Sequence, residues 1–71
     1  MTDFALLDEK IKESGMTIIA ICEKSGIDRA TFYNKRNGRG EFTATEIVNL
    51  TSTLRLNKTE RDKIFLSKNV I

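Results

Sequence analysis

The apolar residues of this chain recur at helical spacing, in short runs that each follow a side chain able to cap a helix. The alternation of apolar and polar residues that predicts a strand is scarce, and the sequence contains no proline. This pattern predicts an all-α fold. A chain of 71 residues has room for one domain with a small core, so residues 1–71 are treated as a single domain.

Five helices are predicted from the capping signals and the apolar runs. The first covers residues 3–14, and the second and third stop at Ser25-Gly26 and Asn37-Gly38. The fourth begins at a Thr-x-x-Glu capping box, and the fifth ends near Ser67, beyond which the last residues are expected to fray. The predicted N-caps, in chain order, are Asp3, Thr17, Asp28, Thr43 and Asn57. The side chains predicted to face the core are Phe4, Leu7, Ile11, Ile18, Ile21, Cys22, Ile27, Phe32, Ile47, Leu50, Leu54, Ile64 and Phe65.

The cysteine content and the N-terminal segment bear on the compartment. Cys22 is the only cysteine, so no internal disulfide can form, which fits a reducing environment. The N-terminal segment is acidic where a secretion signal carries positive charge, and no apolar stretch approaches the roughly 18 residues that span a bilayer. We therefore expect a soluble, cytoplasmic protein with no membrane partner.

Catalysis is not expected from this sequence. It contains no histidine, Cys22 has no plausible base partner, and neither a phosphate-binding glycine loop nor a cluster of metal ligands is present. We expect no metal, no cofactor and no small-molecule substrate. Cys22 is interpreted as a small buried hydrophobe.

Charge is distributed unevenly, although the net charge is only +2. The first helix is mainly acidic, whereas the segment 28–39 carries four cations against the single acid Asp28. The four cations are Arg29, Lys35, Arg36 and Arg39. A local basic segment of this kind is typical of a surface that meets phosphates.

The segment 17–38 has the pattern of a helix-turn-helix. Two short helices are joined by a turn containing Gly26, which tolerates the backbone geometry of a steep crossing, and Ile27 can fill the gap between them. In this segment the chain resembles the Cro and CI-type (XRE) regulators of phages and bacteria, and the resemblance extends through the fourth and fifth helices. It implies a compact five-helix domain of the lambda-repressor-like type. The positions that match the family are Cys22, Gly26, Ile27, Phe32, Gly38 and Leu54.

The resemblance implies that the exposed side of the third helix enters the major groove of operator DNA. Arg29 would then pair with guanine, Asn34 with adenine, and Ala30 with a thymine methyl group. The residues implied to face bases are Arg29, Ala30, Thr31, Tyr33, Asn34 and Asn37, and those placed to meet phosphates are Lys35, Arg36 and Arg39. A homodimer is expected because one module of this size buries too little surface for high affinity.

Two positions depart from the family pattern. Lys35 stands where a large apolar residue is usual, so either its methylene stem covers the core or the third helix is displaced. The second helix begins with Ile18, Ile19 and Ala20 where polar residues are usual, and so short a helix cannot bury all its apolar residues. One or both isoleucines should therefore be exposed, as at a protein contact.

The isoleucine-rich second helix supports a second hypothesis, from a different class of function. The chain is also similar to the modulator-of-repression proteins of temperate phages of lactic acid bacteria. In that case the protein is an antirepressor, which binds the phage CI-type repressor and modulates its binding to DNA. Both hypotheses place the protein in a lytic/lysogenic switch in the bacterial host cell, and the sequence alone does not decide between them.

Overall fold

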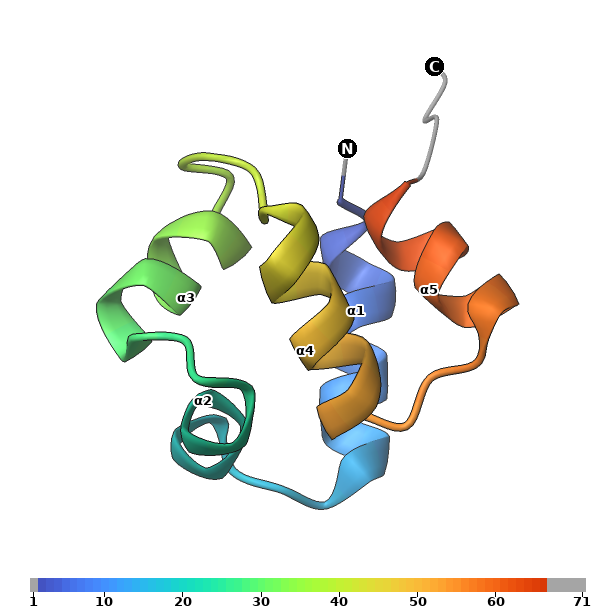
Figure 1. The fold of residues 1–71 in the computed structure, drawn as a ribbon, viewed down its shortest axis with the longest axis horizontal. Coiled ribbons are helices and arrows are strands. Elements are labelled where there is room, and N and C mark those ends of the chain that lie inside the picture. Colours follow the sequence, from blue (N-terminus) through green and yellow to red (C-terminus); the bar gives the residue numbers. More distant parts are fainter. Residues whose placement is uncertain (1, 67–71) are drawn as a thin grey trace.

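The structure, a computed structural model, describes residues 2–66 and contains five α-helices and no strand within that range (Figure 1). The predicted all-α class is therefore confirmed. In chain order the helices are α1 Phe4–Ser14, α2 Ile18–Ser25, α3 Arg29–Arg36, α4 Ala44–Thr53 and α5 Lys58–Phe65.

Each helix begins directly after the residue predicted to cap it, because a side-chain oxygen of that residue accepts a hydrogen bond from a backbone amide in the first turn. At the start of α4 the amide of Glu46 donates to the Thr43 hydroxyl over 3.1 Å, and the Thr43 amide donates to the Glu46 carboxylate over 2.9 Å. The predicted capping box is thus confirmed. Helix α5 ends at Phe65, two residues before the predicted end at Ser67, and Ser67 and the predicted fraying lie outside the described residues.

The five helices surround one small core. Helix α4 packs across α2, and α5 packs against both α1 and α4. Figure 1 shows α3 on the opposite side of the molecule from α5, with α1 and α4 between them. The buried apolar side chains are Leu7, Ile11, Ile21, Cys22, Ile27, Phe32, Phe42, Leu50, Leu54, Ile64 and Phe65. Of the predicted core residues, Phe4, Ile18 and Ile47 are only partly buried.

Three aromatic rings run through this core from α3 to α5. The ring centroids of Phe32 and Phe42 are 6.0 Å apart, and those of Phe42 and Phe65 are 5.7 Å apart. Phe42 lies in the connection before α4, and sequence analysis did not place it in the core. Its position directly before the cap residue Thr43 is that of the first partner in a hydrophobic staple, which was the available signal.

The short connection between α2 and α3 sets how the two helices meet. Gly26 has a φ of 72°, in the left-handed region that favours glycine. The amide of Ile27 donates to the carbonyl of Cys22 over 3.1 Å, which closes the end of α2. Ile27 and Phe32 are both buried, as predicted, so α3 returns onto the core directly after the turn.

Replacing Phe32 with alanine is expected to destabilise the protein by about 3–5 kcal/mol, because the ring is completely buried between α3 and the core. A domain this small has a free energy of unfolding only slightly larger than this loss. The variant should therefore be largely unfolded. Thermal unfolding followed by circular dichroism measures the loss. Asn34→Ala, at an exposed position of the same helix, is the matched control and should melt close to the parent. A Phe32→Ala protein with the parental melting midpoint would contradict the packing.

Candidate nucleic-acid interface

Helix α3 buries one side and exposes the other. Phe32 is the buried residue of the helix, and Thr31 is partly buried. The exposed residues follow the spacing i, i+1, i+4, i+5 and i+8, which defines a single face of a helix. They are Arg29, Ala30, Tyr33, Asn34 and Asn37. Except for Thr31, the residues implied to contact bases therefore share one solvent-facing surface, which we call the α3 face.

Lys35 is held against the beginning of α4. Its Nζ lies 2.7 Å from Oε1 of Glu46, and only 18% and 19% of the two side chains are exposed. The same Oε1 accepts the hydrogen bond from the Thr43 amide, so one carboxylate oxygen completes the cap of α4 and fixes the end of α3. Lys35, whose place in the fold the sequence left open, therefore lies in an ion pair with Glu46.

Arg36 is paired with the first helix. Its Nε lies 2.8 Å from Oδ1 of Asp8, and both side chains remain partly open to solvent. An ion pair this exposed contributes only about 0–1 kcal/mol, so Arg36 can exchange Asp8 for another anion, such as a phosphate, at small cost. Sequence analysis did not identify Asp8 as a partner, since 28 positions separate the two residues.

Arg29 and Arg39 form no ion pair within residues 2–66, and both are exposed. They lie at opposite ends of the basic segment, one in the first turn of α3 and the other after its last turn. Of the four cations predicted to meet nucleic acid, these two are thus the ones whose charge is not already matched by a carboxylate of the described chain.

Two pKa shifts describe the surroundings of α3. Burial alone would raise the pKa of the Glu46 carboxyl, but hydrogen bonds from Lys35 and Thr43 outweigh it and hold that pKa below its ordinary value. Burial raises the pKa of the Cys22 thiol. The thiol therefore stays protonated and poorly nucleophilic, consistent with its interpretation as a buried hydrophobe.

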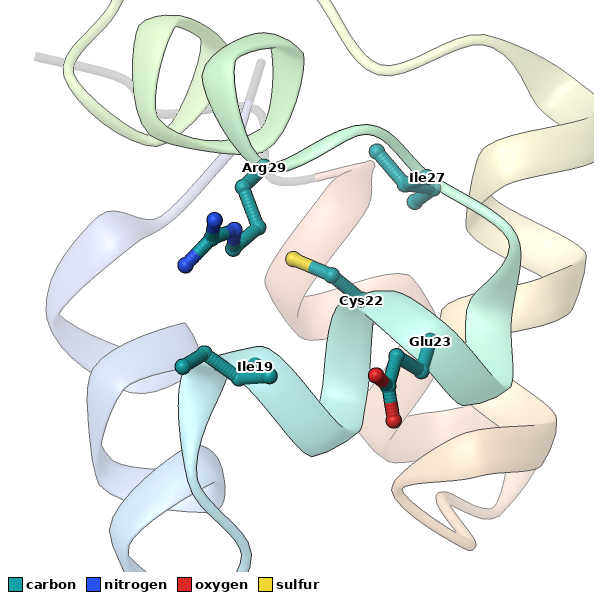
Figure 2. A pocket seen from close by; sticks show the side chains of 5 residues that line it. All are labelled: Ile19, Cys22, Glu23, Ile27 and Arg29. Atoms are coloured by element: carbon teal, nitrogen blue, oxygen red, sulfur yellow. The ribbon is translucent and has the colours of Figure 1, made fainter.

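A hollow of about 350 Å³ lies beside the α3 face, where α2 meets the start of α3. Its lining residues are Ile19, Cys22, Glu23, Ile27 and Arg29, drawn in Figure 2, and we call it the α2–α3 hollow. Ile19 is 50% exposed, whereas Ile18 is partly buried against the core. The two isoleucines thus differ, because Ile18 lies three positions before Ile21 on the buried stripe of α2.

A second exposed aliphatic side chain lies on α4, where sequence analysis named none. Val48 is 62% exposed and falls outside the stripe formed by Ile47, Leu50 and Leu54. Its position between stripe residues was the signal that could have identified it.

Within residues 2–66 no helix is long and apolar enough to cross a membrane, and no group of three or more acidic or cysteine side chains is arranged to hold a metal ion. Comparison with known protein families, with curated proteins and with solved structures finds no match to this chain. What the protein does must therefore be argued from the surfaces described above.

Replacing Glu46 with glutamine keeps a residue able to complete the capping box but removes the charge that Lys35 binds. Because the pKa of Glu46 is lowered in the folded protein, its contribution is complete above the pKa of the unfolded chain and is lost as the pH falls through the folded-state pKa. The parent should therefore be more stable than Glu46→Gln at neutral pH by about 1 kcal/mol, with the difference vanishing in acid.

Urea unfolding midpoints at neutral pH and below the lowered pKa measure this difference. Glu9→Gln is the matched control, since Glu9 is exposed on α1 and forms no ion pair among the described residues. A Glu46→Gln difference that is the same at both pH values would show that the ion pair does not stabilise the fold.

Proposed function

We propose that this protein is a transcriptional regulator of the lambda-repressor-like helix-turn-helix type, with α3 as the helix that reads DNA. The observation that carries the proposal is the α3 face: a helix fixed on one side by Phe32 presents mainly polar side chains to solvent on the other. Arg29 at its start and Arg39 beyond its end add charge that no carboxylate of the described chain neutralises.

The dimensions of α3 suit the major groove. A helix with its side chains is roughly 10–12 Å across, which fits the roughly 12 Å width of the groove, and the eight residues of α3 extend roughly 12 Å along it. In that setting Arg29 donates two parallel hydrogen bonds to guanine, Asn34 pairs with adenine, and Ala30 contacts a thymine methyl group. Arg39 binds a phosphate directly, and Arg36 does so after exchanging Asp8.

A single domain of 8.1 kDa covers little DNA, so high affinity requires two copies on neighbouring half-sites of an operator. The sites that fit are operators of a phage lytic/lysogenic switch, in the cytoplasm of the bacterial host. Such operators are commonly two-fold symmetric, which matches two copies of one chain.

Arg29→Ala and Arg39→Ala are expected to weaken DNA binding in different ways. Loss of Arg29 should reduce the affinity for the operator by about 1–3 kcal/mol and leave binding to random DNA nearly unchanged. Loss of Arg39 should weaken binding to all sequences and flatten the dependence on salt, because one phosphate contact is removed. Fluorescence anisotropy with operator and random duplexes over a salt series measures both effects.

Lys63→Ala is the control for this pair, because Lys63 is exposed on α5, on the far side of the molecule from α3. It should bind like the parent. If both arginine variants lose the same affinity for operator DNA as for random DNA, Arg29 makes only an electrostatic contact and does not read a base. A parent protein that binds neither duplex at low salt would remove the DNA-binding proposal.

The exposed Ile19 favours a second candidate function, that of an antirepressor. A half-exposed isoleucine beside a hollow is typical of a protein contact, and ion pairs occupy two of the four cations near α3. In this role the protein binds the phage CI-type repressor through α2 and modulates its binding to DNA.

Ile19→Glu is expected to abolish repressor binding, because an unpaired charge would be buried at the contact. The melting midpoint should stay within a few degrees of the parent, since Ile19 does not belong to the buried core. Pull-down of the cognate repressor, with circular dichroism as the folding control, tests this. Arg29→Ala should still bind if α2 alone makes the contact. A folded Ile19→Glu protein that retains the repressor would exclude Ile19 from the interface.

A further inference from the structure

The α2–α3 hollow has an ordered arrangement of apolar and charged side chains. Figure 2 shows Ile19 and Ile27 at two ends of a line that passes close to Cys22. Arg29 and Glu23 lie on opposite sides of this line, and both are exposed. Neither forms an ion pair with another residue in the described part of the chain.

This arrangement is complementary to itself. When two identical surfaces meet face to face, the two-fold axis lies in the plane of contact, and each side chain meets the position across the axis. An axis along the line from Ile19 to Ile27 places Ile19 against Ile19 of the second copy. The same rotation would bring each Arg29 opposite Glu23 of the other copy, on either side of the exposed Ile19.

We propose that the α2–α3 hollow is a self-association surface whose occupant is a second copy of this chain. The charges favour a second copy as the occupant, because each copy supplies both the cation, Arg29, and the anion, Glu23, that the other copy requires. The exposed Val48 on α4 offers no such match. Its helical neighbours on the exposed side are Ala44, Thr45 and Ser52, which carry no charge to fix an orientation.

Self-association through this hollow regulates the proposed reading of DNA, and this consequence rests on the proposed function. Arg29 belongs to both surfaces, so a pair joined through the hollow has its two Arg29 side chains engaged with Glu23. The pair is therefore a form that does not read operator DNA, and it is distinct from two copies bound side by side on half-sites. Rising protein concentration favours this form and lowers the fraction of the protein that is available to DNA.

We expect the dimer formed through the hollow to be weak. The hollow is a small part of the surface, so we expect a dissociation constant in roughly the micromolar to millimolar range. A weak contact of this kind responds to changes in concentration rather than locking the protein in one state.

Sedimentation equilibrium of the protein without DNA tests the association itself, at concentrations up to about 1 mM. The parent should show a monomer–dimer equilibrium. Arg29→Glu and Glu23→Arg should each weaken it by roughly tenfold or more, because like charges then face each other across the contact. Ile19→Ser should weaken it as well, whereas Val48→Ser, at the other exposed aliphatic position, should match the parent.

The charge exchange gives the decisive comparison. An equal mixture of Arg29→Glu and Glu23→Arg restores both ion pairs between unlike copies and should form a heterodimer, although each variant alone remains largely monomeric. The double variant Arg29→Glu/Glu23→Arg should self-associate again. Circular dichroism confirms folding of every variant, all of which change exposed residues.

A parent that stays monomeric throughout, or folded charge variants that neither pair in the mixture nor recover in the double variant, overturns the proposal. In that case the hollow is not a self-association surface, and a different partner, such as the repressor, would be tested there. DNA binding is measured separately with Ile19→Ser, which keeps Arg29 and should bind operator DNA at least as well as the parent at high protein concentration. Failure of Ile19→Ser and parent alike to bind any DNA removes the proposed function while leaving the self-association result standing.

Discussion

The position of α3 depends on the burial of Phe32. An isolated helix of eight residues is unstable in water, so α3 exists because it is packed against the rest of the domain. Phe32 supplies the fully buried contact, and its ring continues through Phe42 to Phe65 on the last helix. This row of aromatic rings connects α3 with the far side of the core, and it thereby fixes which face of α3 meets solvent.

Two ion pairs refine that position, and they differ in strength because they differ in exposure. The pair of Lys35 with Glu46 is mostly shielded from water and shares its carboxylate oxygen with a helix cap, so it ties two helix ends together. The pair of Arg36 with Asp8 is more open and easily exchanged. These two ion pairs neutralise Lys35 and Arg36, so the proposed contact with DNA depends mainly on Arg29 and Arg39.

Arg29 is where the proposed activities meet. A guanidinium group presents a planar set of donors that suits a guanine edge and a carboxylate equally well. At the start of α3, Arg29 belongs to the α3 face and also lines the α2–α3 hollow together with Ile19 and Glu23. If both proposals hold, the two surfaces compete for Arg29, because its guanidinium group is engaged by one partner at a time.

The sequence by itself determined the helices and their starting points. Capping hydrogen bonds join residues three positions apart, as between Thr43 and Glu46, so local sequence decides them. The exposed face of α3 also followed from spacing once a helix was predicted there. Tertiary structure alone decided that Phe42 joins the core and that Arg36 pairs with Asp8, 28 positions earlier in the chain. These outcomes depend on how helices distant in sequence cross and pack, which spacing along the chain does not specify.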